Sequence, residues 1–425
     1  DSANLSASRT VLADPFPVRA DGTRFDAPYG NTLGANRLAG SGVTMHPRNY
    51  RPAWQQRWRI GIQREITKNM VIEASYNGTF SRIPVNARID YLPQKYWATG
   101  NVRNQALDDE LNRNITNPFN LTNLASLRSS NPVVYNYLST KGFFTGSTIR
   151  KHQLLRQYPN LNDSSGLRPG VDIKDALGRN KYGDLQVQFE RRFSRGFQSA
   201  VMYTYSTGEE QDYYYNQFDA APSVYRPQDA LRPHRLIWTA VWEMPFGKGR
   251  KWVTGGPLQH IVGGWQLSWI YQYQNGAATG WGNRFFYGDM SKLQDVFNHS
   301  SVNSKDIHVW FDPNITYRGT GAIPQGFTGF EGRSGSQPGS YHVQMFPTRL
   351  GELRNDGIRT WDIKILRKFR LYERLALSTA VDLLNATNHT NFGGPNTDPT
   401  NRNFGLVTST NGYSRVIQLT GRIEF

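Results

Sequence analysis

The C-terminal end of the chain alternates apolar and polar residues with a period of two. Between residues 415 and 425, the apolar positions are Ile417, Leu419, Ile423 and Phe425, and the polar positions are Gln418, Thr420, Arg422 and Glu424. Because successive side chains on a strand point to opposite faces, this pattern predicts a β-strand with one apolar and one polar side. A length of about 9–11 residues is what a tilted strand needs to cross a bilayer.

Eight further segments repeat this alternation and are also predicted to be strands. The clearest places Trp265, Leu267, Trp269, Tyr271 and Tyr273 opposite Gln266, Ser268, Gln272 and Gln274. Because proline cannot donate to a strand ladder, it is excluded from strand interiors, and none of the 22 prolines lies inside the nine segments. The eight segments cover residues 57–63, 70–77, 184–190, 197–206, 235–243, 265–274, 361–365 and 375–383.

The connections between these segments alternate between short and long. Tight turns are predicted at 67–69, 194–196 and 370–374, and an intermediate connection at 245–264. The long connections are 80–181, 207–233, 275–360 and 386–414. Transmembrane β-barrels alternate in this way, with short periplasmic turns and long extracellular loops. We therefore predict an all-β fold, an antiparallel transmembrane β-barrel that is partial, with about nine or ten strands of a larger barrel.

The same topology divides the chain into two predicted regions. Residues 1–53, rich in Gly, Pro, Asn and Arg, are predicted to be an extracellular loop region at a truncated N-terminus, and residues 54–425 the C-terminal part of the barrel. The chain starts at Asp1 without the signal peptide that an exported protein needs. We expect the beginning of the protein to be missing from this sequence.

Strand alternation also assigns side chains to the two faces of the predicted barrel. The apolar set is expected to face lipid, with the Trp residues in interfacial belts, although the core of a soluble sandwich is a competing role for them. It comprises Trp238, Trp242, Trp265, Leu267, Trp269, Tyr271, Ile417, Leu419, Ile423 and Phe425. The polar set is expected to line a wet lumen and comprises Arg57, Arg59, Glu73, Gln186, Gln188, Glu190, Gln266, Gln272, Asp362, Lys364, Asp382, Gln418 and Arg422.

Candidate chemistry is sparse along the chain. The lumen acids alternate with bases, which indicates cross-strand ion pairs rather than the paired acids of a hydrolase, so no catalytic residue is predicted. Loop aromatics are candidates for ligand binding because aromatic faces stack on sugars and close over apolar solutes, with loop packing as the alternative. These aromatics are Tyr213, Tyr214, Tyr215, Trp281, Phe285, Phe286 and Tyr287.

Composition removes several other classes of site. The mean hydropathy is −0.61 and no apolar run approaches 18 residues, so no transmembrane helix is predicted. The absence of cysteine excludes disulfides and thiolate metal sites, and the eight histidines lack metal-ligand spacing. No cofactor is expected. The net charge of +16 suggests nucleic acid at first, but the bases are dispersed without a binding motif, and anionic lipopolysaccharide explains the sign equally well. The run from Gly247 to Lys251 lacks phosphate-loop spacing and is interpreted as a solvated periplasmic turn.

A set of short motifs carries a resemblance to a known family. They are the segments 76–79, 92–96, 155–159, 184–196, 233–235, 244–249, 263–266, 385–389, 392–396 and 404–405, for example Asp184-Leu-Gln-Val-Gln-Phe-Glu-Arg-Arg-Phe-Ser-Arg-Gly196 and Met244-Pro-Phe-Gly-Lys-Gly249. In order and spacing, over about residues 50–425, they resemble TonB-dependent outer-membrane receptors. The similarity is to the Oar-like group, which has an N-terminal carboxypeptidase-regulatory-like domain.

The resemblance implies a barrel of about 22 strands, a lumen plug and a TonB box, and the last two are not visible in this sequence. We therefore expect ligand capture and energised import of an unknown solute, such as an oligosaccharide or peptide, across a Gram-negative outer membrane. The expected partners are outer-membrane lipid and lipopolysaccharide, the barrel-assembly machinery through the strand ending in Phe425, and the TonB complex through the missing N-terminal parts. The alternatives are a non-transporting adhesin or glycan-binding surface protein and, third, a secreted β-rich carbohydrate-active enzyme.

Overall fold

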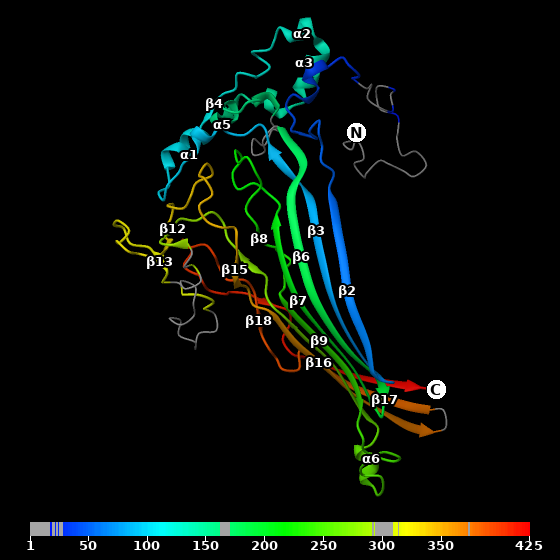
Figure 1. The fold of residues 1–425 in the computed structure, drawn as a ribbon. Helices are drawn as coiled ribbons and strands as arrows, with labels where there is room; N and C mark the ends of the chain where they lie inside the picture. The colour runs from blue at the N-terminus through cyan, green and yellow to red at the C-terminus, as the bar shows by residue number, and fades with distance from the viewer. Residues whose placement is uncertain are drawn as a thin grey trace. The chain divides into compact units, whose positions relative to one another are not determined.

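One large sheet dominates the computed structural model, which describes residues 18, 22, 24, 29–161, 171–290, 293, 309–312, 314–372 and 375–425. Nine strands follow one another across this sheet in chain order (Figure 1). They are β2 (Trp54–Thr67), β3 (Met70–Arg88), β6 (Val171–Ser194), β7 (Phe197–Gln211), β9 (His234–Glu243), β10 (Trp265–Gln274), β16 (Ile358–Tyr372), β17 (Leu375–Leu384) and β20 (Val416–Glu424). Each strand predicted from the sequence is present, and the bounds of β10 agree residue for residue.

Several strands are longer than the alternation indicated. β3 was predicted to end at residue 77 but continues through Pro84 to Arg88. The pairing of β3 with β2 ends at the pair Trp54–Arg82, so Pro84 lies beyond the stretch that β2 covers. A missing N–H there costs no hydrogen bond to β2. β6 likewise begins at Val171 and β16 runs on to Tyr372, which shortens the predicted connections on either side.

Short and long connections lie at opposite ends of this sheet, as the sequence predicted. The pairs Thr67–Met70, Ser194–Phe197 and Tyr372–Leu375 close three tight hairpins at one end; residues 373 and 374 lie outside the described residues. The β6–β7 hairpin has a two-residue turn in which Arg195 and Gly196 both have positive φ, 53° and 77°. Two positive φ angles are typical of the type I′ turn, whose twist matches that of the flanking strands.

Smaller elements fill the connections. The intermediate connection after β9 contains the helix α6 (Leu258–Val262). Beyond the main strands, β11 (Ala278–Gly280) pairs with β15 (Arg349–Arg354), β14 (Gly329–Glu331) lies between β12 (Phe286–Tyr287) and β13 (Thr316–Tyr317), and β18 (Asn391–Phe392) pairs with β19 (Thr410–Asn411). The remaining elements are β1 (Val43–Met45), η3 (Gln94–Tyr96), α1 (Gln105–Asn112) and β8 (Arg226–Pro227), which pairs with β7.

A second compact unit, formed by residues 1–44 and 112–172, was not predicted as such. The sequence indicated only a long loop after β3, but this stretch folds into short elements around a core of its own that includes Leu33, Val134 and Phe144. Asn131 caps α3 by accepting a hydrogen bond from the Val134 amide, with Pro132 at the first helical position. The elements are η2 (Gly34–Leu38), β4 (Asn114–Thr116), α2 (Leu127–Ser130), α3 (Pro132–Ser139), α4 (Gly142–Thr145), β5 (Thr148–Arg150), α5 (Lys151–Leu154) and η4 (Pro159–Leu161).

Within the described ranges, no helix combines the length and the apolarity needed to span a bilayer.

The β6–β7 turn gives a first prediction. A Cβ at Gly196 would lie 3.2 Å from the backbone oxygen of Glu243, and the φ of +77° disfavours any L side chain. We expect Gly196→Ala to destabilise the hairpin by about 1–3 kcal/mol and to lower the folded fraction, measured by heat-modifiable migration. Gly255→Ala is the matched control, because Gly255 has open space around its Cβ position and no positive φ. Equal folded fractions in the two variants would contradict the positive-φ turn at Gly196.

Candidate functional site

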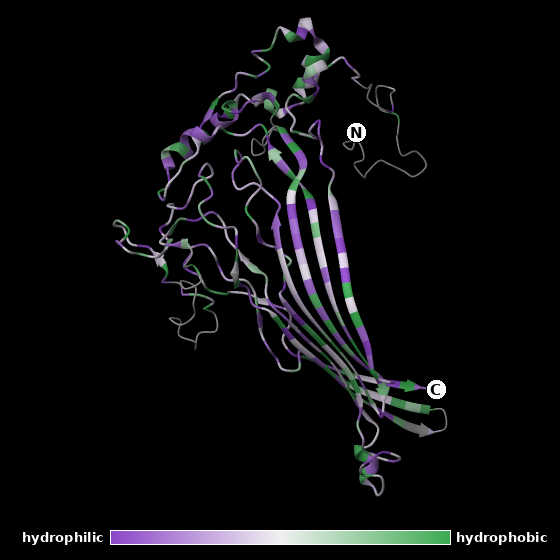
Figure 2. Cartoon of the chain, viewed as in Figure 1, coloured by the Kyte–Doolittle hydropathy of each residue, from purple (hydrophilic) through white to green (hydrophobic). Residues whose placement is uncertain are grey.

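The register of the sheet sorts its side chains into two chemically different faces. One row joins Trp242, Leu267, Ile365, Val381 and Leu419 across five strands. The next row on the same face joins Ala240, Trp269, Ile363, Leu383 and Ile417. Figure 2 shows the two kinds of residue alternating along the strands. A continuous apolar face of this kind needs either hydrocarbon or another protein layer against it.

The predicted lipid-facing residues all share this face. Trp238 and Tyr271 form a directly opposed pair on it, and Ile423 lies opposite Leu377 at one end. The indole of Trp238 donates a 3.0 Å hydrogen bond to the Ser199 hydroxyl, which satisfies its N–H without water. Phe425 follows the last residue of β20 and is 94% exposed.

Both ends of the apolar face carry aromatic rings beside basic groups. Toward the long connections, the Tyr203 hydroxyl lies 2.7 Å from the His234 Nδ1, and the Arg359 guanidinium lies 5.5 Å from the centre of the Tyr273 ring. Toward the short connections, Arg367 lies 5.2 Å from the Trp265 ring. The eight-residue separation of Trp265 and Tyr273 corresponds to about 27 Å of strand. Tilted by about 40°, that length spans roughly 21 Å along the membrane normal, slightly less than the apolar band of about 25 Å, so both rings lie near its edges.

The opposite face is polar and carries the predicted lumen residues. Lys364 and Asp382 are directly opposed, with a 3.2 Å ion pair, and the Arg59 guanidinium lies 2.5 Å from the Glu73 carboxylate. Gln186, Gln188, Glu190, Gln266, Gln272, Asp362, Gln418, Arg422 and Arg57 occupy positions of the same face. These are the cross-strand ion pairs expected from the sequence, and their exposure to solvent leaves each pair worth roughly 0–1 kcal/mol.

Two hollows lie on this polar face. The larger, of about 470 Å³, has a mainly apolar lining that includes Ala200, Val241, Ile270 and Leu384, with Asp362, Lys364 and Asp382 among its polar residues. The second, of about 300 Å³, is lined by Gln55, Arg57, Asn77, Tyr182, Asp184 and Gln228. In the second hollow the buried Asp184 carboxylate accepts a 2.7 Å hydrogen bond from the Asn77 amide. Hydroxyl, amide and charged groups of this kind suit polar solutes.

At the long-connection end, a charged network joins the polar face to the loops. Arg226 on β8 is 9% exposed, donates a 2.7 Å hydrogen bond to Asp212, and lies 4.3 Å from the centre of the Tyr213 ring. Arg349 on β15 donates to Glu210, a polar-face residue of β7. Because these contacts run from the loops to the polar face, the loops fold over that side of the sheet.

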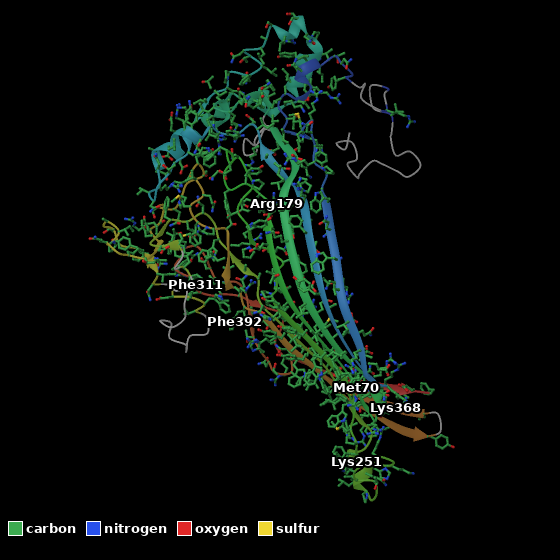
Figure 3. The ribbon with its side chains drawn as sticks, viewed as in Figure 1. Met70, Arg179, Lys251, Phe311, Lys368 and Phe392 are labelled. Atoms are coloured by element: carbon green, nitrogen blue, oxygen red, sulfur yellow. The ribbon has the colours of Figure 1, made fainter. Side chains whose placement is uncertain are left out.

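The described residues of the β10–β16 and β17–β20 connections, here called the loop body, share an aromatic core. Trp281 stacks on Phe330 with ring centres 5.3 Å apart and planes 4° from parallel. Phe311, Phe346 and Phe404 surround this pair. Phe404 belongs to the connection between β17 and β20, whereas the others belong to the connection between β10 and β16. Figure 3 shows Phe311 among these loops, with Met70 and Lys368 near the short turns. The core therefore ties two long connections together.

The candidate ligand-binding aromatics divide into two groups by burial. Trp281, Phe285 and Phe286 are buried, with Phe285 at 0% exposure, so in this structure they pack the loop body. Tyr213, Tyr214, Tyr215 and Tyr287 are half-buried. Burial raises the pKa of the Tyr213 phenol, whose hydroxyl contacts the Thr348 hydroxyl at 2.5 Å. Burial also raises the pKa of Tyr287, with the nearby Glu331 carboxylate acting in the same direction.

The long-connection end of the polar face is here called the mouth. The charged residues that attach the loops there were not predicted from the sequence. Arg226, Arg349, Glu210 and Asp212 drew no attention because their partners lie 14 to 139 positions away in the chain. The acidic run Glu209–Asp212 immediately before three tyrosines was the available signal. Among the described residues, no group of three or more His, Asp or Glu side chains has the geometry to hold a metal ion.

Comparison with known proteins gives one family and several distant structures. A family model described as an outer membrane beta barrel domain matches residues 1–418. No curated protein matches the chain. The outer membrane transporter YddB from Escherichia coli is similar at 10% identity and a TM-score of 0.35, over 89% of this chain and 34% of that one. The ferric preacinetobactin receptor BauA from Acinetobacter baumannii is similar at 8% identity and 0.36, over 87% and 29%. The chain thus spans about a third of these structures.

The mouth network supports a second prediction. Replacing Arg226 by Met removes the partner of Asp212, whose side chain is 33% exposed, and losing a hydrogen bond between charged groups costs about 1.5–3 kcal/mol. We expect faster amide hydrogen exchange across residues 212–231 and 344–354, measured by mass spectrometry. Asp229→Asn is the control, because Asp229 is 77% exposed and lies 3.7 Å from Arg349, so its loss costs less than about 1 kcal/mol. Unchanged exchange in the Arg226 variant would show that the network does not hold the loops.

Proposed function

The chain belongs to the outer membrane β-barrel domain family, and we propose that it forms part of the wall and mouth of a TonB-dependent importer of a polar solute. The family places the protein in the Gram-negative outer membrane. Within that setting, the apolar face of the sheet contacts lipid and the polar face lines the lumen. The single observation that carries the import proposal is that the loop body attaches to the polar face through Arg226 and Arg349.

The attachment matters because it places binding groups above a wet passage. A loop body that folded over the apolar face would compete with lipid, whereas one over the polar face constricts and covers the lumen mouth. The two hollows on the polar face supply carboxylate, amide and basic groups along the wall below it. A solute that enters at the mouth then meets hydrogen-bonding groups in succession, which suits passage of a polar molecule.

Solute contact is assigned to the half-buried tyrosines. Tyr214, Tyr215 and Tyr287 are half-buried, so each ring can still stack on a sugar or cover an apolar part of a solute. Trp281, Phe285 and Phe286 support them from the loop core. No group is assigned a chemical step, because the charged pairs of the site are satisfied by one another.

The motifs quoted from the sequence support the TonB-dependent, Oar-like assignment. Under this assignment, coupling to the energised TonB complex runs through a plug and TonB box encoded outside the present sequence. The barrel-assembly machinery engages β20 and its terminal Phe425, and lipopolysaccharide contacts the outer rim of the lipid face.

The alternative is an outer-membrane adhesin or glycan-binding surface protein that does not transport. The observation that favours it is the ordered aromatic core of the loop body, since a rigid loop platform also serves surface recognition. Dependence on TonB separates the two, because an adhesin functions without the energised complex.

The face assignment gives a third prediction. Trp269 lies on the apolar face near its middle, and a basic residue at a bilayer midplane costs about 2–4 kcal/mol in a barrel. We expect Trp269→Arg to impair assembly, measured as loss of the heat-modifiable form in outer-membrane fractions. Gln272→Arg, three positions along the same strand on the polar face, is expected to assemble normally. Similar assembly of both variants would overturn the assignment of lipid and lumen.

Uptake provides the test of function and a fourth prediction. A strain deleted for the complete reading frame is compared with its parent for growth on maltoheptaose, a linear hexapeptide or ferric citrate, with and without TonB. We expect a TonB-dependent growth defect on at least one of these solutes. On that solute, Tyr214→Ala is expected to raise the apparent KM for uptake about 2- to 10-fold, because stacking contributes roughly 0.5–1.5 kcal/mol.

Tyr372→Ala is the matched control for Tyr214→Ala. Tyr372 is 71% exposed and lies at the short-connection end of the sheet, far along the strand from the mouth. Its removal is expected to leave uptake unchanged. Surface binding of a glycan that persists without TonB, together with no uptake defect on any solute, would replace the importer by the adhesin.

A further inference from the structure

The connection between β9 and β10, residues 244–264, differs from the other short connections. It is the longest of them and folds into a small lobe that contains α6, here called the α6 lobe (Figure 1). Phe246 and Trp252 pack with ring centres 5.6 Å apart and form a bridge between the two halves of the lobe. The lobe is therefore a defined structure rather than a simple hairpin turn.

The exposed surface of the α6 lobe combines apolar and basic side chains. Trp252, Leu258 and Ile261 are 48%, 53% and 63% exposed. The segment 244–264 contains Lys248, Arg250 and Lys251 and no acidic residue. Arg250 pairs with Glu243 at 2.6 Å, whereas Lys248 and Lys251 have no ion-pair partner among the described residues. Figure 3 shows Lys251 on the lobe, away from the sheet.

Hydrogen bonds hold the lobe against the apolar face of the sheet. The indole N–H of Trp265 donates to the backbone oxygen of Ile261 at 3.0 Å, and an N–H of Arg367 donates to the same oxygen at 2.9 Å. Trp265 and Arg367 are opposed across β10 and β16 and lie on the apolar face. The end of α6 is thus fixed on the side of the sheet that contacts lipid, at the level where the aromatic and basic rim begins.

We propose that the α6 lobe is an interfacial anchor that binds the anionic phospholipid headgroups of the periplasmic leaflet. The inference rests on the lipid-facing assignment of the apolar face. With that face in hydrocarbon, Ile261 and Leu258 reach the boundary between headgroups and acyl chains, and Trp252 takes the usual interfacial position of an indole. Lys248 and Lys251 then lie where phosphates concentrate, and each basic side chain near such a surface favours binding roughly fivefold.

Charges from the neighbouring elements agree with this orientation. Glu243 at the end of β9 and Glu424 at the end of β20 are paired with Arg250 and Lys368. Their negative charge is therefore compensated locally, and the remaining cations give the lobe a net positive surface. A phospholipid layer containing phosphatidylglycerol matches both the charge and the exposed apolar residues.

The test exploits a chain without cysteine. The full protein, with any cysteine outside residues 1–425 replaced by serine and with Ile261→Cys, is labelled with a nitrobenzoxadiazole dye and reconstituted in phosphatidylcholine vesicles with increasing phosphatidylglycerol. We expect a blue-shifted emission that doxyl-labelled lipid quenches, with a midpoint at low phosphatidylglycerol content. Combined Lys248→Glu and Lys251→Glu substitution should move that midpoint severalfold higher. Lys68→Glu, in the β2–β3 turn at the same end of the sheet, should move it less than twofold.

Labels at two other positions make the outcomes separable. A dye at Leu419, which is 76% exposed on the apolar face, reports the lipid contact on which the inference rests. A dye at Asn411, an exposed residue of the short strand β19 in the β17–β20 connection, reports water. Quenching at 419 with water-like emission at 261 for every lipid mixture would overturn the anchor alone. No quenching at 419 would overturn the lipid-facing assignment as well. Quenching at 261 with the same phosphatidylglycerol midpoint after the Lys248→Glu and Lys251→Glu substitutions would overturn the specificity for anionic lipid.

Discussion

Backbone hydrogen bonding in a solvent without water is the constraint on which this structure depends. A strand that crosses hydrocarbon must give its N–H and C=O groups to neighbouring strands, because an unpaired group costs several kcal/mol there. The main sheet meets this requirement at every junction between its nine strands, which pair in chain order. Consecutive pairing also fixes the two faces, since one register shift would exchange apolar and polar side chains along a whole strand. The bands of tryptophan and aliphatic residues, and the polar wall opposite, follow from that single arrangement.

The loop body depends on a different contribution, the burial of aromatic rings, which keeps the long connections ordered outside the membrane. Long connections lose much conformational entropy when they fold, and here burial of aromatic rings around Trp281 and Phe330 offsets that loss. The charged contacts of Arg226 and Arg349 add direction, because they attach the body to one face of the sheet. Burial of the aromatic rings therefore stabilises the loops. The ion pairs of Arg226 and Arg349 determine which face of the sheet the loops cover. Under the proposed function, the partly exposed tyrosines at the mouth contact the solute.

The sequence predicted the sheet well because its signal is local. Alternation with a period of two identified all nine long strands, and the glycine and asparagine turns marked their ends. The same signal did not detect the short helices after β3, because helices of four to eight residues show little periodicity. Their core also includes Leu33, which lies about 100 positions earlier in the chain. Nor could this signal separate Trp281 from Tyr214, because an aromatic residue in a loop looks the same whether it is buried or exposed. The partners of Arg226 and Arg349 were invisible for the reason that long-range pairing leaves no local pattern.

The sharing of Phe404 between two connections has a mechanical consequence. Rings from the β10–β16 connection and from the β17–β20 connection interlock in one close-packed cluster, and close-packed clusters resist deformation. Moving one connection without the other would open voids around the shared rings. A displacement of either connection is therefore expected to be transmitted to its partner.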